Sequence, residues 1–393
     1  MVRRVIGLAL AFAVVSAAPA LAVDWTQAGR TAGRSGFNGT ESVIDATNVA
    51  NLQTKWTYAA GGVVGTPVVA GGTVYFTSGD GDLVALDEST GLPRWSPVPV
   101  TTSGAPRLAV DKKHGIIVAS WDGNLQAFHT DSGAPAWDIP GAGTTAANPT
   151  DPALFKGKVF SATANGTIIA VNVSNGGTLW EASTVTLQDA VTSPAVAAGH
   201  VMFVAGDAAK PRLQALDVAT GAPLWDRTAP VGVDAGPVIA GGVVYTATLT
   251  GDDVVARSIV DGTLLFSKNV SGTTGVAYAQ GVLYASRSVA GNATSGGVVA
   301  LDAVTGDRLW AASTGGLSVT TPASIANGVV YVGVSDERLT PVGDGRLLAL
   351  STSQPGTQVK YSPGQDQYWR SAPAVVNGHV IVGHGHEVFS LAP

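Results

Sequence analysis

The chain has 393 residues, of which 13% are charged and 45% are hydrophobic, and it contains 50 glycines. This composition predicts many short strands joined by tight turns, and no amphipathic helical period stands out. A formal net charge of −6 gives no basic surface for nucleic acid, which we exclude as a partner. The absence of cysteine excludes disulfides, thiolate metal sites and cysteine-linked haem.

Residues 1–22 have the pattern of a cleavable signal peptide. Arg3 and Arg4 precede an apolar run from Val5 to Val15, and Ala20-Leu21-Ala22 fits the small-x-small cleavage pattern. The apolar run is shorter than the roughly 20 residues that span a bilayer. We therefore expect a secreted or extracytoplasmic protein with no transmembrane segment.

Residues 23–51 follow without any repeat. This stretch is rich in glycine and threonine, and Trp25 and Phe37 are its aromatic residues. We expect an irregular N-terminal segment laid over the outside of the fold.

From residue 52 onward the chain is built on one repeat, shown by ALDESTGLPRW at Ala85 to Trp95. A polar head at the repeat's third position lies eight residues before an aromatic residue. The head and aromatic pairs are Asp87 and Trp95, His129 and Trp137, Asn172 and Trp180, Asp217 and Trp225, Ser258 and Phe266, and Asp302 and Trp310. Asp or Asn can accept hydrogen bonds from the loop, the following glycine tolerates positive φ, and the tryptophan can pack against the next repeat.

The repeat period of roughly 40 to 45 residues predicts four antiparallel strands per repeat. In the first repeat we expect them at Thr66 to Ala70, Val74 to Thr77, Leu83 to Leu86 and around Trp95. A seventh, longer copy ends at Tyr361. The last repeat lacks its fourth strand at the C-terminus, and residues 52–58 with Trp56 can supply it. The sequence thus predicts an all-β fold, an eight-bladed β-propeller formed by residues 52–393 and closed by an N-terminal strand.

The repeat, ALDxxTGxxxW preceded by GxVY, resembles that of the PQQ-like propeller superfamily, which includes quinoprotein alcohol dehydrogenases and the outer-membrane assembly factor BamB. The stretch from Trp25-Thr26-Gln27 through Arg34, Gly36 and Asn38 to Leu52 and Trp56 also resembles the start of secreted PQQ-repeat proteins. The resemblance covers the mature chain and implies the fold, but it does not single out one activity. The lack of cysteine departs from the dehydrogenases with a vicinal cysteine pair and from the lipid-anchored BamB.

By resemblance to other propellers, the face on which the first strand of each blade begins is the expected place for a ligand funnel. The candidate ligand- or partner-binding residues in its loops are Trp121, Asp189, Asp234, Arg338, Tyr368, Trp369, Arg370, His384 and His386.

For three groups of these residues the sequence allows either a functional or a purely structural role. Asp189 and Asp234 could hold Ca²⁺ or act as a general base, or they are solvated loop carboxylates. His384 and His386 would share one face of a strand, as metal-binding pairs do, but they flank Gly385 in a tight hairpin and no third ligand is identifiable. Trp369 lies off the repeat register, so it is either a binding hot spot beside Arg370 or part of a lid packed on the propeller face.

The expected function is that of an exported, monomeric, non-catalytic propeller that binds a protein, peptide or envelope polymer through its loop face. For this function we predict no catalytic residue, no metal site and no cofactor. The alternative is a PQQ- and Ca²⁺-dependent quinoprotein dehydrogenase, or a related enzyme, with its site in the central funnel. A hydrolase or lyase is a third possibility, which no Gly-x-Ser-x-Gly motif supports.

Overall fold

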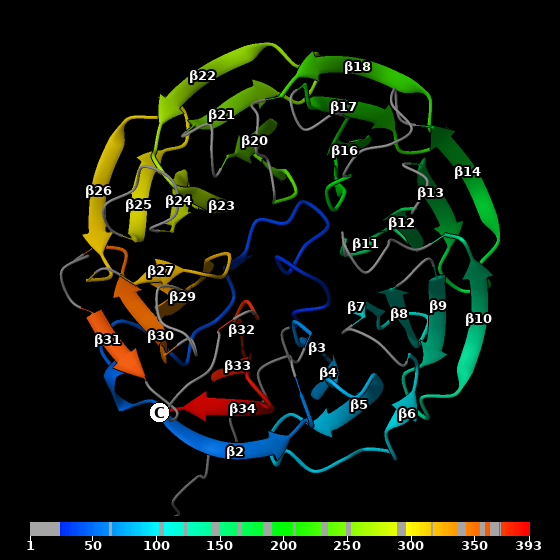
Figure 1. Cartoon of the computed structure of the whole chain (residues 1–393), viewed down its shortest axis with the longest axis vertical. Helices are drawn as coiled ribbons and strands as arrows, with labels where there is room; N and C mark the ends of the chain where they lie inside the picture. Colours follow the sequence, from blue (N-terminus) through cyan, green and yellow to red (C-terminus); the bar gives the residue numbers. More distant parts are fainter. Residues whose placement is uncertain are drawn as a thin grey trace, which may run out of the picture.

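The computed structural model describes residues 24–62, 65–101, 106–121, 124–142, 150–163, 167–183, 191–206, 210–229, 235–248, 253–288, 296–315, 317–336, 343–353, 358–361, 369 and 371–393. The proposed signal peptide lies outside this part of the chain. Eight antiparallel sheets stand around a central axis in chain order (Figure 1), which confirms the predicted eight-bladed β-propeller.

The first four blades follow one another along the chain, and their strands run from the axis outward. Blade 1 contains β3 (Val68–Ala70), β4 (Thr73–Thr77), β5 (Asp82–Asp87) and β6 (Val98–Pro99). Blade 2 contains β7 (Arg107–Asp111), β8 (Ile116–Trp121), β9 (Asn124–His129) and β10 (Pro135–Pro140). Blade 3 contains β11 (Ala153–Phe155), β12 (Lys158–Ala162), β13 (Thr167–Asn172) and β14 (Thr178–Ser183). Blade 4 contains β15 (Ala195–Ala197), β16 (His200–Ala205), β17 (Arg212–Asp217) and β18 (Pro223–Thr228).

The other four blades complete the ring. Blade 5 contains β19 (Val238–Ala240), β20 (Val243–Ala247), β21 (Asp253–Ser258) and β22 (Leu264–Asn269). Blade 6 contains β23 (Thr273–Ala279), β24 (Val282–Arg287), β25 (Gly297–Asp302) and β26 (Arg308–Ser313). Blade 7 contains β28 (Ser324–Ala326), β29 (Val329–Asp336), β30 (Gly343–Ser351) and β31 (Gln358–Tyr361), joined by β27 (Ser318–Val319) and β1 (Phe37–Asn38). Blade 8 contains β32 (Ala374–Val376), β33 (His379–His384), β34 (Glu387–Ala392) and, outermost, β2 (Gln53–Ala59), which follows the short 3-10 helix η1 (Val49–Asn51).

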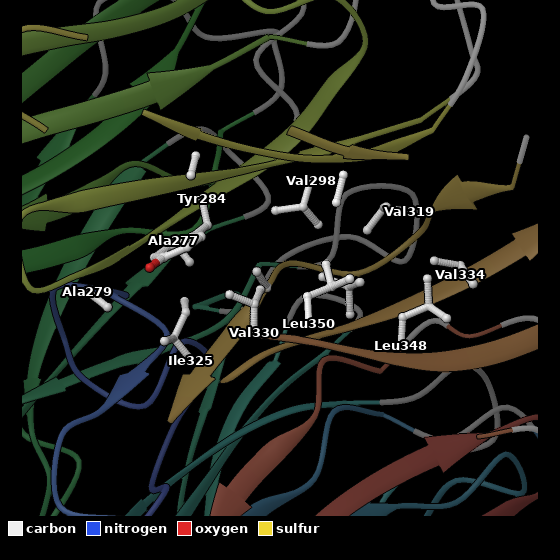
Figure 2. Packing of buried hydrophobic residues seen from close by; sticks show 14 residues of the cluster. Ala277, Ala279, Tyr284, Val298, Val319, Ile325, Val330, Val334, Leu348 and Leu350 are labelled. Atoms are coloured by element: carbon white, nitrogen blue, oxygen red, sulfur yellow. The ribbon is translucent and has the colours of Figure 1, made fainter. Parts of the chain in front are cut away.

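The hydrophobic core lies between the blades. Each of the eight interfaces between neighbouring blades holds its own cluster of buried apolar side chains. Figure 2 shows the cluster between blades 6 and 7, where Tyr284 and Val298 face Val330 and Leu350. Strands buried on both faces explain why the repeats are almost continuously apolar in their second and third strands.

The repeat tryptophans connect each blade to the next. The indole N–H of Trp56 donates to the carbonyl of Glu88, the residue that follows the polar head Asp87 of the next repeat. The other repeat tryptophans, except in the fifth repeat, which ends in Phe266, donate to the residue at the same position in the repeat that follows them. The equivalent pairs, at 2.8 to 3.3 Å, are Trp95 and Thr130, Trp137 and Val173, Trp180 and Val218, Trp225 and Ile259, and Trp310 and Thr352. The ring, which is buried in Trp56, Trp180 and Trp225 and half-buried in the other three, and its N–H together therefore stabilise the interface between blades.

The repeat glycine is needed because the tryptophan of the preceding blade lies against it. Gly91 has φ +70°, and a Cβ there would lie 2.7 Å from the Trp56 ring. The head carboxylate of Asp87 accepts hydrogen bonds from the backbone N–H groups and hydroxyls of Ser89 and Thr90, which lowers its pKa to about 2 despite the opposing effect of burial.

The outer strand of blade 1 departs from the predicted pattern. The repeat register predicts it around Trp95, but β6 covers only Val98–Pro99. Pro93, Pro97 and Pro99 have no backbone N–H to donate, and the ladder with β5 is interrupted between the Leu86–Pro93 bridge and the pairing of Asp82 with Pro99. Trp95 still donates its indole N–H to Thr130.

The predicted position of the N-terminal segment on the outside is wrong. Residues 24–38, which we call the axial segment, run through the middle of the ring (Figure 1). Trp25 is 1% exposed there, and Ile44 further along is completely buried with the residues between blades 7 and 8. The chain then reaches the periphery, where β2 pairs with β34.

Candidate functional site

The axial segment contacts the inner strand of every blade in order. The inner strands are edge strands, and the same position in seven of them donates its backbone N–H to the segment at 2.7 to 2.9 Å. The donors are Val69, Val110, Leu154, Val196, Ile239, Tyr278 and Ile325, and their acceptors are Trp25, Thr26, the Gln27 side chain, Ala32, Gly33, Ser35 and Gly36. In blade 8 the Asn38 amide donates to the equivalent Val375 carbonyl at 2.8 Å. The segment therefore satisfies backbone groups that the propeller would otherwise leave exposed at its axis.

Above this segment lies a cavity of about 280 Å³, which we call the axial cavity. Its walls come from the beginnings of the inner strands, including Thr66, Arg107, Asp151, Ser193 and Ser324. Its floor comes from the axial segment, with Ala28, Gly29 and Arg34. The cavity thus lies where the topology predicts a funnel, and the protein's own chain closes its base.

An ion pair between the floor and the wall dominates the cavity. Arg34 donates from Nη2 to Oδ2 of Asp151 at 2.8 Å, and the Ser193 hydroxyl lies 3.3 Å from the same oxygen. Burial alone would raise the pKa of Asp151, but the Arg34 and Arg107 charges and the hydrogen bonds outweigh it, so the pKa lies below its usual value. Arg34 has φ +60°, a left-handed conformation that is uncommon outside glycine and that the surrounding contacts must hold in place.

Arg107 is the second arginine of the cavity, and it is bound less completely. Its Nε lies 4.0 Å from Oδ1 of Asp151, which is an ion-pair distance but too long for a hydrogen bond. The Nε atom is buried and has no hydrogen-bond partner in the described part of the chain. The side chain is 31% exposed, so solvent reaches the guanidinium group.

The described lining does not suit Ca²⁺. The ion needs six to eight oxygen ligands, whereas the lining residues include one carboxylate, Asp151, which is already paired with Arg34 and faces Arg107. The described residues contain no group of three or more potential metal-binding side chains.

The described part of the chain contains four of the nine candidate residues, namely Trp121, Trp369, His384 and His386. Asp189, Asp234, Arg338, Tyr368 and Arg370 lie outside the described residues. Trp121 ends β8 and is partly buried against the core between blades 1 and 2.

Trp369 is completely buried, and its ring packs against His384 and Phe389 between blades 7 and 8. Its ring is therefore not available to a partner. The two histidines do not share a face: His384 ends β33 and is 7% exposed, whereas His386 lies exposed in the following turn. Gly385, with φ +55°, lies in the turn between them, as expected for the tight hairpin that the sequence indicates.

The residues that form the cavity, namely Arg34, Arg107, Asp151 and Ser193, are not among the candidates predicted from the sequence. Arg107, Asp151 and Ser193 come shortly before or at the start of inner strands of successive blades, which is the repeat position that faces the axis. The signal in the sequence that could have pointed to the cavity is the occurrence of a polar residue at this position in three consecutive repeats.

The comparisons with known proteins agree with this architecture. The family model described as outer membrane protein assembly factor BamB matches residues 22–183, 121–350 and 209–391. The BamB protein of Yersinia pestis is 26% identical over 246 residues, which cover 56% of this chain and 60% of that protein. That relative is therefore matched over less than two thirds of its length.

Two solved structures share the fold. BamB from Moraxella catarrhalis superposes with a TM-score of 0.64 at 20% identity, over 87% of this chain and 98% of that one. The quinohemoprotein alcohol dehydrogenase from Comamonas testosteroni gives a TM-score of 0.71 at 16% identity, over 94% and 80%. At these identities the structural likeness shows the fold alone, but the family model spans the propeller from end to end. This chain belongs to the family described as outer membrane protein assembly factor BamB.

Proposed function

We propose that this protein is a non-catalytic binding module outside the cytoplasm, which holds a protein partner at the face where the axial cavity lies. The family supports a role in assembling other proteins, because its description names an outer membrane assembly factor. No helix in the described part of the chain is long and apolar enough to cross a membrane.

The axial cavity is the observation that carries the proposal. Its base is closed by the axial segment, and its one described carboxylate is held by Arg34. A general base or a cation ligand needs a carboxylate free to accept a proton or an ion, and Asp151 is already committed to an arginine. The arrangement suits recognition of a group that enters from the open side.

Photo-crosslinking in the native envelope tests this function. Photoreactive p-benzoylphenylalanine replaces Thr66 in the cavity wall or, as the control, exposed Lys113 in the turn at the far end of β7. We expect a discrete protein adduct from position 66 and none from position 113. Equal labelling at both positions, or none at either, would contradict the proposal.

Titration of the purified mature protein with PQQ and Ca²⁺ tests the dehydrogenase alternative. A ligand at 100 times its Kd stabilises the folded state by about 2.7 kcal/mol. A melting shift of that size would overturn the non-catalytic proposal, and an unchanged melting temperature is the expected result.

A further inference from the structure

We infer that the axial cavity receives the C-terminal carboxylate of a polypeptide partner and that Arg107 binds it. This inference rests on the proposed binding function and names the chemical group that enters the cavity. Four features of the cavity lead to it.

The first feature is the charge balance. The charged residues among the described lining are Arg34, Arg107 and Asp151. Arg34 and Asp151 neutralise each other at 2.8 Å, which leaves one positive charge on Arg107. Binding of a group with one negative charge would bring the net charge of the described lining to zero.

The second feature is the set of donors on Arg107. No hydrogen bond links this guanidinium group to any described residue, and the nearest carboxylate oxygen is 4.0 Å from its Nε. A planar guanidinium group pairs with a carboxylate through two parallel N–H···O bonds. The buried Nε–H gains a partner when a carboxylate binds, which removes the cost of an unsatisfied buried donor.

The third feature is the carboxylate of Asp151 beside Arg107. A phosphate group carries nearly two charges at neutral pH and would lie close to this carboxylate, where like charges repel. A carboxylate carries one charge and is repelled less. The cavity therefore favours a carboxylate over a phosphate.

The fourth feature is the closed floor. The axial segment bonds to all eight inner strands, so a polypeptide cannot thread through the ring. A chain end or a side chain can reach Arg107 from the open side, whereas a chain threaded through the ring cannot. The wall opposite Arg107 is built from small or apolar residues, including Ala235, Val238 and Pro322, and it accommodates the last side chain of an entering peptide.

The test uses calorimetric titration of the intact mature protein with three short peptides. The first is N-acetyl-trialanine with a free C-terminal carboxylate, and the second is its C-terminal amide. The third carries an aspartate in its middle and an amide at its end, so its carboxylate is on a side chain. We expect saturable binding of the free acid below about 10 mM, and binding at least about tenfold weaker for both amides.

The matched variants are Arg107→Gln, Arg107→Lys and Lys113→Gln. Arg107→Gln should weaken binding of the free acid by at least about tenfold, and Arg107→Lys should retain part of it, because lysine keeps the charge without the planar donor pair. Lys113→Gln makes the same change of charge in the exposed turn that follows the same strand and should leave binding unchanged.

Three results would overturn the inference: equal affinity for acid and amide, equal binding of the side-chain carboxylate, or full binding by Arg107→Gln. The comparison of peptides on the unaltered protein does not depend on any variant folding. A protein that crosslinks a partner from position 66 yet shows no preference for the free acid would keep the proposed function and lose this inference.

Discussion

The hydroxyl of Tyr245 donates a buried hydrogen bond of 3.0 Å to the carbonyl of Ala303. Ala303 follows the polar head of the sixth repeat, and its carbonyl corresponds to the ones that accept indole N–H groups elsewhere in the ring. The fifth repeat ends in Phe266, which has no N–H to donate. Tyr245 comes from β20 of the same blade and supplies the missing donor.

Replacing Tyr245 with phenylalanine should therefore destabilise the protein by about 1–3 kcal/mol, because the buried Ala303 carbonyl loses its donor. Tyr284→Phe is the control: Tyr284 occupies the corresponding place in β24, where Trp310 already bonds to the next blade. Urea unfolding measures both, and equal losses in the two variants would refute the role of Tyr245.

Gly91→Ala should be more destabilising than Gly72→Ala, although both glycines have positive φ. Gly72, at +75°, has nothing within 4 Å of an added Cβ, so alanine there costs the backbone strain of about 1–2 kcal/mol. Gly91 adds a clash with the Trp56 ring at 2.7 Å, and we expect roughly twice the loss. Similar melting temperatures for the two variants would show that the ring moves aside without cost.

Gln27→Ala should destabilise the axial segment in blade 3. The Gln27 side chain is 6% exposed, donates to the Leu154 carbonyl at 3.2 Å and accepts from the Leu154 N–H at 2.8 Å. Its loss leaves the N–H and the carbonyl of Leu154 without these partners. Each unsatisfied group costs about 1–3 kcal/mol of stability unless a water molecule replaces the side chain. Gln53→Ala, on the exposed side of β2, should be nearly silent in the same thermal melts. Two silent variants would show that the axial segment adds little stability here.

Glu88 makes the protein less stable at higher pH. It is 6% exposed next to Trp56, and its carboxylate accepts from Asn377 at 3.1 Å. Burial raises its pKa from 4.5 to about 7, the Asn377 hydrogen bond opposes this rise, and nearby acidic side chains add to it. The folded protein thus binds this proton more tightly than the unfolded chain. Below pH 4.5 Glu88 costs nothing, and as the pH rises through 7 the buried charge removes stability, by roughly 3 kcal/mol at most.

Glu88→Gln should accordingly raise stability at pH 8 and change it little near pH 4.5. Glu181→Gln, an exposed residue of β14, provides the control and should show no such pH dependence. Unfolding free energies at several pH values give the answer. A stabilisation by Glu88→Gln that is equal at all pH values would contradict the shifted pKa.

The repeat could be predicted from the sequence because its parts are close together along the chain. The spacing from Asp87 to Gly91 and Trp95 predicts one turn and one strand. The number of copies of this motif along the chain predicts the number of blades. The repeat register alone also places the outer strand of blade 1 around Trp95, because it takes no account of the three prolines that lack a backbone N–H.

The axial cavity could not be predicted in the same way. Arg34 and Asp151 are 117 positions apart, and one of them belongs to a segment without any periodic pattern. The place of Trp369 stayed open for a related reason: its off-register position allowed either a binding role or a packed one, and the space that buries it is formed by His384 and Phe389. Contacts of this kind depend on the completed ring.

The route of the axial segment also determines the order in which the chain can finish folding. Asn38 bonds to Val375, which is 337 positions further along, so the first residues of the fold acquire their last partner only when blade 8 is present. Such distant contacts form late, because the entropy of closing a long loop opposes them. During this interval the inner edges of the early blades can pair with other chains. Aggregation therefore competes with closure of the ring during the interval before blade 8 has formed, and a slow or incomplete arrival of the C-terminal residues prolongs this interval.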